Sequence, residues 1–364
     1  MKELKFGIAY DALDGQRSLA DEFDDLVASA RLAEDLGFDS IWFGETHRRK
    51  PGHGHAPSPL VLCAALAGVT TRLQLGTAAL LPPMYTPLQL AEEAAVVDQL
   101  TRGRLILGVA SGMEVYLDFG FDNVPFERAD LRKIMDESLE LVRRFWSEES
   151  VDADGYFKYA GAACIPQPFQ DPRPPLLVGG ITPEALRRAA KCDGWVGGTP
   201  YPFGLVKAVR ERFDDARRES GGGGRGFALI RPIVVADTDQ RAVALRDDYV
   251  TPLIDYYLAR GAYVRSDFTF ARPASEADRV QALEEIAIVG SPETCAAEIV
   301  RYVEEAGVDH FIFRVRFPGS DRDQAQQMLL AIAEDVLPRV RAAVGEPTAI
   351  GAATNGGTGG SAGA

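Results

Sequence analysis

Residues 73–112 are interpreted as one strand, helix and strand unit, which constrains the fold more than any other part of the chain. Residues 73–81 and 105–110 are apolar nearly throughout, as is typical of parallel strands that are buried on both faces. Between them lies a segment whose small and apolar residues recur at helical spacing, namely Leu88, Ala91, Ala94 and Ala95. Because two parallel strands joined by one helix make a right-handed unit, we expect a parallel sheet covered by helices.

The same alternation of apolar strand and amphipathic helix repeats along the chain. It predicts eight strands, which begin near residues 4, 40, 73, 105, 176, 194, 227 and 310. Eight such strands favour a closed barrel over an open doubly wound sheet, and the GxGxxG motif that usually follows the first strand of an open sheet is missing. We therefore predict an α/β fold, a (β/α)8 TIM barrel that spans residues 1–343.

Two segments interrupt the alternation and are expected to be insertions. Residues 148–175 are too rich in proline for a helix and predict a hairpin packed outside the barrel. Residues 261–285 are the second insertion, of which 261–278 are expected to be irregular. The tail, residues 344–364, has little apolar surface to bury and is expected to be disordered.

Charge and composition exclude several classes of function. A net charge of −14 without any basic run argues against binding to nucleic acid. No segment reaches the roughly 18 to 20 uninterrupted apolar residues of a membrane helix, and the first residues lack the pattern of a signal peptide, so a soluble cytoplasmic protein is expected. The four cysteines are far apart and never form a CxxC pair, which gives no indication of a zinc site or of a disulfide framework.

Polar residues that follow the predicted strands are the candidates for chemistry, because a barrel carries its active site at the carboxyl ends of its strands. The second strand ends at Glu45, Thr46 and His47. An imidazole titrates near neutral pH, so His47 beside Glu45 could act as a proton donor or base, although a structural histidine is the alternative. His53 and His55 follow in the same loop without the helical spacing of a metal pair, and we predict no metal site.

Two further strand ends carry small residues. Thr77, Ala78 and Ala79 either fill the core or let a flat ring approach the backbone. After a later strand, a glycine pair and a threonine place free N–H groups and a hydroxyl at a helix N-terminus, the residues being Gly179, Gly180 and Thr182. This arrangement indicates an anion site or, equally, a tight strand-to-helix turn.

Aromatic residues in the loops could line an apolar substrate pocket beneath a mobile loop, and Tyr116 and Phe268 are our candidates. Ordinary packing within an insertion is the alternative for each of them.

Arginines also interrupt two apolar strands. Arg314 and Arg316 alternate with apolar residues on the last strand, so at least one should point into the barrel or toward its mouth, with an anionic partner. Arg104 begins a strand at the opposite face, where a role in stability is expected.

Three segments together resemble the bacterial luciferase-like flavin monooxygenases. They are IWFGETH, GTAALLPP followed by PLQLAEEAAVVDQLTRGRLILGVASG, and PPLLVGGITPEALRRAAKCDGW. The resemblance extends over residues 4 to 342 and implies a (β/α)8 barrel that binds reduced FMN, or in other branches a deazaflavin coenzyme (F420), at the carboxyl-terminal mouth. Dimers are frequent in this family, so a homodimer is expected.

The resemblance also implies roles for individual residues. In the luciferase branch, the positions of Ala78 and Ala79 support the flavin ring through a non-prolyl cis peptide bond. The flavin side chain or its phosphate is expected to contact Ser111 and Gly112 after one strand, and Gly179, Gly180 and Thr182 after another.

The chain departs from the luciferases at two positions. Luciferases have two consecutive histidines after the glutamate, the first of them catalytic, whereas this chain has Thr46 and then His47, as in the deazaflavin branch. Luciferases also carry an arginine where Ser111 stands. The Gly-Thr-Ala-Ala match, in contrast, favours FMN.

These inferences predict a flavin-dependent oxidoreductase with His47 and Glu45 as its catalytic residues. The main hypothesis is a two-component monooxygenase that uses O2 and reduced FMN, supplied by a separate flavin reductase, on a small organic substrate. One alternative is an F420-dependent oxidoreductase that transfers hydride. The other is a non-catalytic luciferase-like subunit.

Overall fold

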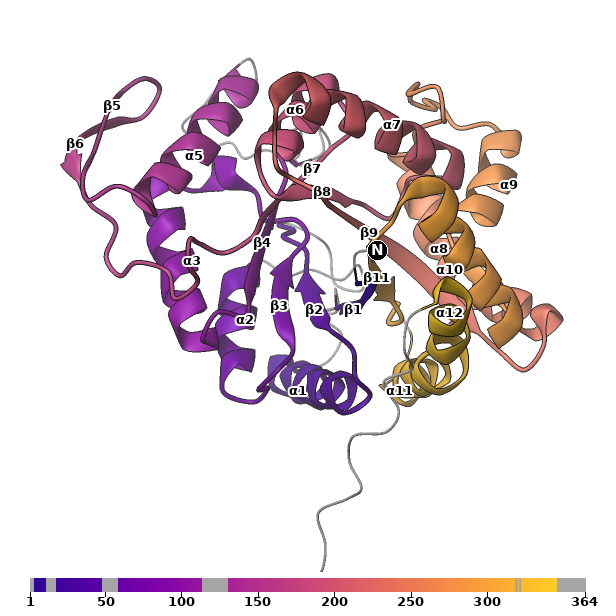
Figure 1. Ribbon diagram of the computed structural model, residues 1–364. Coiled ribbons are helices and arrows are strands. Elements are labelled where there is room, and N and C mark those ends of the chain that lie inside the picture. The colour runs from indigo at the N-terminus through magenta and orange to yellow at the C-terminus, as the bar shows by residue number, and fades with distance from the viewer. Residues whose placement is uncertain are drawn as a thin grey trace, which may run out of the picture.

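Eight parallel strands close into a barrel in the computed structural model of the chain, which describes residues 3–10, 18–47, 58–112, 130–317, 320 and 322–345 (Figure 1). The strands are β1 (Lys5–Ala9), β2 (Ser40–Phe43), β3 (Gln74–Thr77), β4 (Leu105–Val109), β7 (Leu176–Gly179), β8 (Gly194–Gly197), β9 (Gly226–Val235) and β11 (His310–Arg314). The barrel closes because β1 pairs with both β2 and β11, and β9 pairs with both β8 and β11. The predicted (β/α)8 barrel is confirmed, with the eight barrel strands in their expected places.

One side chain dominates the interior of the barrel. Trp42 is 1% exposed and packs with apolar residues from β1, β4, β7, β8, β9 and β11. A Cβ atom at Gly76 on the neighbouring strand would lie only 2.3 Å from the Trp42 ring, so this position has room for glycine alone. The indole therefore fills the barrel below its carboxyl-terminal mouth, and Ala78 packs against the same cluster.

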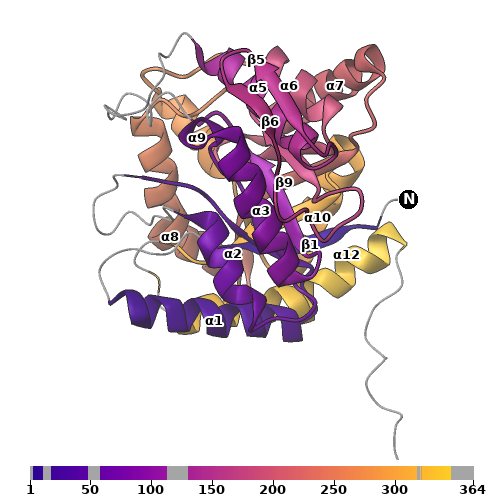
Figure 2. The ribbon, with the colours of Figure 1, turned by 90° about the vertical axis from the view of Figure 1, so that its left-hand side faces the viewer.

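Helices surround the barrel and bury their apolar faces on the outside of the strands (Figure 2). They are α1 (Leu19–Asp35), α2 (Pro59–Ala67), α3 (Pro87–Thr101), α5 (Leu131–Phe145), α6 (Pro183–Lys191), α7 (Phe203–Ser220), α10 (Pro292–Ala306) and α11 (Arg322–Ala331), which continues through η3 (Ile332–Val336) into α12 (Leu337–Val344). Several begin directly after a hydroxyl side chain that accepts a backbone N–H of the first turn, as at Ser18, Thr86, Thr182 and Ser291. No helix among the described residues is long and apolar enough to cross a membrane.

The first insertion is the expected hairpin. Its strands β5 (Val151–Asp154) and β6 (Lys158–Ala162) pair antiparallel with each other and with no barrel strand. The hairpin projects from the barrel beside α5 (Figure 1).

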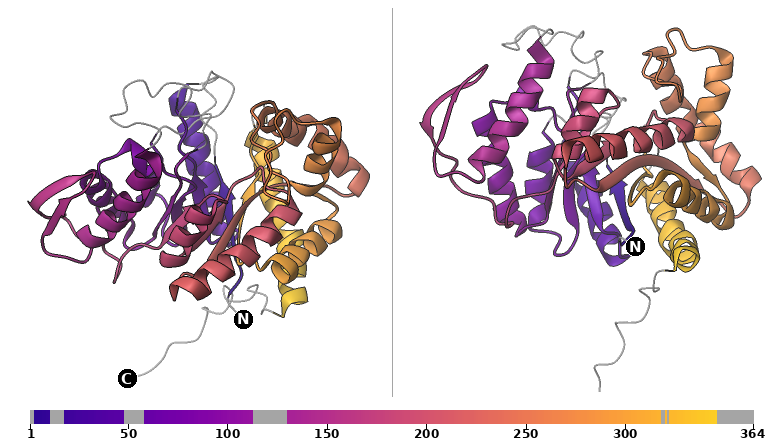
Figure 3. Two further views of the ribbon diagram at one scale, coloured as in Figure 1. Left: turned by 90° about the horizontal axis from the view of Figure 1, so that it is seen from above. Right: turned by 45° about the horizontal axis from the view of Figure 1, so that its top comes forward.

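The second insertion has more structure than the sequence predicts. It contains α9 (Glu276–Glu285) and is followed by the short strand β10 (Ile288–Gly290). Together with the preceding helix α8 (Asp239–Ala259), these elements bury an apolar cluster that is separate from the main core. Residues 261–275 are irregular as expected, apart from one bridge between Val264 and Phe270, whereas α9 and β10 were not predicted. This insertion and the hairpin lie on opposite sides of the molecule (Figure 3).

Candidate active site

A buried carboxylate at the carboxyl end of β2 organises the candidate site. Glu45 is 4% exposed, and its Oε1 atom lies 2.8 Å from His47 Nε2. The Tyr85 hydroxyl donates to the same oxygen over 3.1 Å, and the Leu81 amide donates to Oε2 over 2.7 Å. The predicted Glu45–His47 pair is therefore present, and a second segment of the chain holds its carboxylate.

The imidazole of His47 is oriented by this bond. Its side chain is 24% exposed, whereas that of Glu45 is 1% exposed. In a neutral imidazole, donation from Nε2 to the carboxylate leaves Nδ1 as the nitrogen that can accept a proton. The pair has the chemistry of a general base or proton donor.

The peptide bond between Ala78 and Ala79 is cis, as the family resemblance implies. Ala78 N donates to Phe43 O over 2.7 Å, and Glu45 N donates to Ala79 O over 3.1 Å, so the end of β2 holds this peptide on one side. Both alanines are partly exposed, and the residues that flank them are buried. This partly exposed peptide therefore lies at the carboxyl ends of β2 and β3, next to the carboxylate that binds His47.

Thr77 contributes to this turn through its buried hydroxyl. Its Oγ1 donates to Gly108 O over 2.7 Å and accepts from Gly108 N over 3.0 Å, which ties β3 to β4. Contact between Thr77 and a cofactor stays a prediction, and the side chain's observed contacts are structural.

Ser111 and Gly112 lie just beyond β4, and both are partly exposed. Gly112 has a φ angle of +81°, and a Cβ atom there would lie 3.5 Å from Leu81 Cδ2. These residues therefore adjoin the segment that follows the cis peptide.

The predicted anion site lies at the end of β7. Gly180 has a φ angle of +110°, and its carbonyl accepts the Trp195 indole N–H over 2.7 Å. Thr182 Oγ1 accepts from Ala185 N over 3.3 Å and thus serves as the N-cap of α6. The alternative of a tight strand-to-helix turn accounts for the threonine hydroxyl, and an anion would be bound chiefly by backbone N–H groups.

These strand ends are neighbours in the barrel. A Cβ atom at Gly179 would lie 3.2 Å from Val196 O and 3.3 Å from Ala110 Cβ, which brings the ends of β4, β7 and β8 together. With the contacts of Glu45 across β2 and β3, the predicted residues occupy four consecutive strand ends of one mouth, those of β2, β3, β4 and β7.

Comparison with known proteins identifies the family. The model of the family described as luciferase-like monooxygenase matches residues 4–310. The chain belongs to this family. An F420-dependent glucose-6-phosphate dehydrogenase from Amycolatopsis mediterranei is 29% identical over 341 residues, which cover 90% of this chain and 98% of the relative.

Other members of the luciferase-like family carry out oxygenation. The oxygenase component of a flavin-dependent trigonelline monooxygenase from Acinetobacter baylyi is 26% identical over 64% of each chain. The crystal structure of monooxygenase RslO1 from Streptomyces bottropensis superimposes with a TM-score of 0.79 at 25% identity, over 92% of this chain and 99% of that one. These relatives are oxidoreductases, and so is this luciferase-like protein.

The two candidates for the substrate pocket, Tyr116 and Phe268, are not among the described residues that contact Glu45 and the neighbouring strand ends. Tyr116 lies outside the described residues, as do His53 and His55. Phe268 has a φ angle of +69°, and the Arg212 guanidinium lies 3.4 Å from its ring centroid. The ring thus packs against α7 and the main core, not only within the insertion, and a role for Phe268 in binding substrate stays a prediction.

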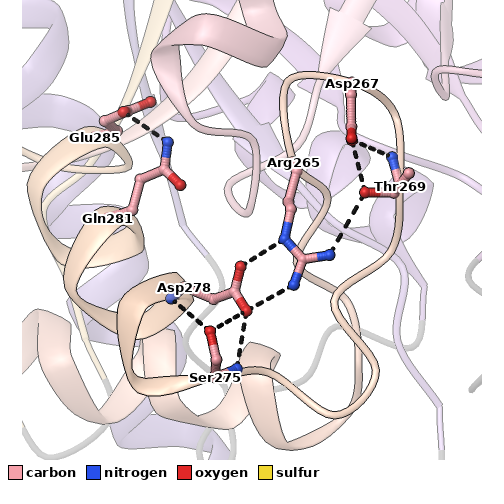
Figure 4. A network of polar contacts seen from close by, with 7 residues as sticks. All are labelled: Arg265, Asp267, Thr269, Ser275, Asp278, Gln281 and Glu285. Atoms are coloured by element: carbon pink, nitrogen blue, oxygen red, sulfur yellow. Dashed lines mark hydrogen bonds and ion pairs between the residues drawn. The ribbon is translucent and has the colours of Figure 1, made fainter.

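The segment that carries Phe268 is held by an ion pair, which Figure 4 shows. Arg265 Nε and Nη2 lie 2.7 and 2.8 Å from the two carboxylate oxygens of Asp278. Ser275 adds bonds from its amide and its hydroxyl to Asp278 Oδ2. The hydrogen bonds from Arg265, followed by those from Ser275, hold the pKa of Asp278 well below its ordinary value.

Arg316 has the anionic partner that the sequence predicts, and its direction toward the mouth stays a prediction. Arg316 is 6% exposed, its Nη2 lies 3.8 Å from Asp25 Oδ2, and it also donates to the Tyr10 hydroxyl. Burial raises the pKa of Tyr10 to about 12, against the opposing effect of Arg316. At the other face, Arg104 donates to the carbonyls of residues 67, 70, 73 and 101 and so supports stability.

Sequence reasoning missed Tyr85, which binds Glu45 in this luciferase-like site. It also missed two buried polar residues beyond β8 and on β9, Thr199 and Arg231. Arg231 is fully buried and donates to Thr199 O over 3.3 Å and to Tyr201 O over 2.5 Å, which holds the loop after β8. The Thr199 side chain is 2% exposed, and its hydroxyl has no partner in the described part of the chain. An arginine within the apolar run of β9 was the one available signal.

Proposed function

We propose that the chain is an F420-dependent oxidoreductase that transfers hydride to or from a small organic substrate. The observation that carries this proposal is the likeness to an F420-dependent dehydrogenase along 90% of the chain and 98% of the relative. The single histidine after Glu45 supports the same branch of the family. F420-dependent hydride transfer is the first alternative predicted from the sequence, and it takes the place of the main hypothesis, monooxygenation with reduced FMN.

Two features at the mouth of the barrel support the binding of a deazaflavin. Ala78 and Ala79 offer a flat surface with only methyl groups, on which a planar ring can lie. The amides that follow Gly179 and Gly180, at the N-terminus of α6, are suited to a phosphate group on the coenzyme side chain. When bound there, the coenzyme supplies hydride transfer.

The chain's own contribution to the chemistry is a proton acceptor. An alcohol that loses hydride from carbon must also lose its hydroxyl proton, and a ketone that gains hydride must gain one. His47, held at Nε2 by Glu45, exchanges that proton at Nδ1. Glu45 keeps the ring oriented and stabilises the imidazolium.

Monooxygenation with reduced FMN is the second candidate. It is favoured by the TM-score of 0.79 to RslO1 and by the Gly-Thr-Ala-Ala segment at the ring surface. This function needs O2 and a separate flavin reductase, and the same histidine would then orient the substrate. A homodimer is proposed for either function.

Binding titrations separate the two candidates. The purified protein is titrated with F420 and, without oxygen, with reduced FMN, and binding is followed by coenzyme fluorescence and by calorimetry. We expect F420 to bind at least a hundredfold more tightly, about 2.7 kcal/mol. Tight binding of reduced FMN with no binding of F420 would exclude the first proposal, and a chain that binds neither would point to the non-catalytic subunit.

A further inference from the structure

Tyr85 and His47 bind the same carboxylate oxygen, although they come from different strand ends. Tyr85 follows the short helix η1 (Pro82–Met84), directly after the segment that contains the cis peptide. Its hydroxyl lies 3.1 Å from Glu45 Oε1, and His47 Nε2 lies 2.8 Å from that atom. The tyrosine therefore touches the catalytic pair without belonging to it.

The second oxygen of the carboxylate is fixed as well. Leu81 N donates to Glu45 Oε2 over 2.7 Å, from the same segment as Tyr85. Residues 81 and 85 thus hold one oxygen each, and the Glu45 side chain is 1% exposed. A carboxylate with donors on both oxygens cannot rotate without breaking a buried hydrogen bond, which is costly.

We propose that Tyr85 is a positioning residue, which fixes the Glu45 carboxylate so that His47 keeps its proton on Nε2. The proposal extends the proposed function, since its consequence for turnover depends on His47 as the proton acceptor. The Tyr85 hydroxyl binds Glu45 and acts on His47 through that carboxylate.

The direction of the tyrosine hydrogen bond follows from its surroundings. Burial, and then the negative charge of Glu45, raise the pKa of Tyr85 well above its ordinary value. The hydroxyl consequently keeps its proton at any pH at which the enzyme works, and can only donate to Oε1. Without this donor, the carboxylate would be held by two hydrogen bonds instead of three, from His47 at Oε1 and from Leu81 at Oε2, and would orient the imidazole less firmly.

The same contacts couple the imidazole to the surface that Ala78 and Ala79 offer. Glu45 N binds Ala79 O over 3.1 Å, while the Glu45 side chain binds residues 81 and 85. Glu45 alone therefore fixes the position of His47 relative to Ala78 and Ala79. Loss of the tyrosine hydroxyl should make the orientation of the His47 ring less fixed, while Ala78 and Ala79 keep their positions.

The test compares Tyr85→Phe with Tyr159→Phe. The control removes a hydroxyl that accepts from Leu88 N over 3.3 Å on the nearby helix α3, away from the catalytic pair. Both variants keep their rings, and thermal unfolding checks that they fold. Because the chain has only four histidines, 15N-histidine NMR of the coenzyme-free protein can resolve His47, assigned by the loss of its signals in His47→Asn.

In the wild type and in Tyr159→Phe we expect well-separated ring 15N shifts for His47, with the proton on Nε2. In Tyr85→Phe the two shifts should move toward each other as the second tautomer becomes populated, and kcat should fall about tenfold with KM little changed, as for one lost hydrogen bond. Unchanged 15N shifts in Tyr85→Phe would overturn the proposal. Altered shifts with unchanged kcat would support the positioning role and instead remove His47 from the proposed chemistry.

Discussion

The amide of Leu81 donates to Glu45 Oε2 over 2.7 Å, and this bond joins the turn after β3 to the residue that orients His47. The two residues are 36 positions apart in the sequence. Their contact depends on the barrel, in which the carboxyl ends of β2 and β3 are adjacent. Leu81, Glu45 and His47 are thus linked by hydrogen bonds. This linkage would fix the position of a coenzyme on the turn relative to a substrate near the histidine.

His47→Ala should lower turnover without affecting the fold. The side chain is 24% exposed, so its removal leaves no closed cavity, and the lost bond to the Glu45 carboxylate should lower the free energy of unfolding by about 1–3 kcal/mol without preventing folding. Loss of a general base typically lowers kcat by about 10² to 10⁴. Steady-state kinetics and urea unfolding measure the two effects, and an unchanged kcat would exclude His47 from the reaction.

Local patterns predicted the barrel and several of its boundaries. The starts of α6 and α10 can be recognised in the sequence, because a hydroxyl N-cap followed by Pro183 or Pro292 marks each one. The strands were recognisable because each is an apolar run between polar ends. These signals are local in the sequence, and tertiary packing did not override them.

Features that depend on long-range contacts were not predictable in this way. Strand β10 has only three residues and exists by pairing with the far end of β9, beyond the barrel. Tyr85 lies 40 residues from Glu45, and no residue next to it in the sequence indicates that its hydroxyl binds a carboxylate of the site. The role of Thr182 was ambiguous from the outset, since an N-cap and an anion site require the same residue types at the same place.

Thr199→Val should be neutral or stabilising, by up to about 1 kcal/mol, because the buried hydroxyl has no partner among the described residues. Thr77→Val is the matched control, since that hydroxyl binds both backbone groups of Gly108, and it should cost about 1–3 kcal/mol. Urea unfolding of both variants checks the difference. Equal losses of stability would mean that the Thr199 hydroxyl is satisfied in solution.

Asp278→Asn should destabilise the second insertion in a manner that depends on pH. The folded-state pKa of Asp278 is lowered, so the ionised carboxylate contributes stability above the ordinary pKa of about 3.9, and this contribution is lost as the pH falls below that value. The stability difference between wild type and variant should thus be full at pH 7 and shrink toward pH 3. Guanidinium unfolding at several pH values measures it.

The matched control for this experiment is Asp154→Asn, which alters the ion pair between Asp154 and Lys158. The Asp154 side chain is 89% exposed. Exposed pairs contribute little, so this control should show almost no difference in stability at any pH. A difference for Asp278→Asn that stayed constant from pH 7 to pH 3 would contradict the assigned role of the carboxylate.

Thr182→Ala separates the two roles of the residue at the start of α6. Loss of the N-cap should cost about 1 kcal/mol of stability. Ser291→Ala is the control, because Ser291 caps α10 in the same way, with a hydroxyl 3.3 Å from Thr294 N and a proline next in sequence.

If backbone amides bind the coenzyme phosphate, both variants should lose similar stability and keep the coenzyme Kd within about twofold, a change below about 0.4 kcal/mol. A Kd that rose tenfold in Thr182→Ala alone would show that the hydroxyl binds the phosphate directly, in spite of its bond to Ala185 N.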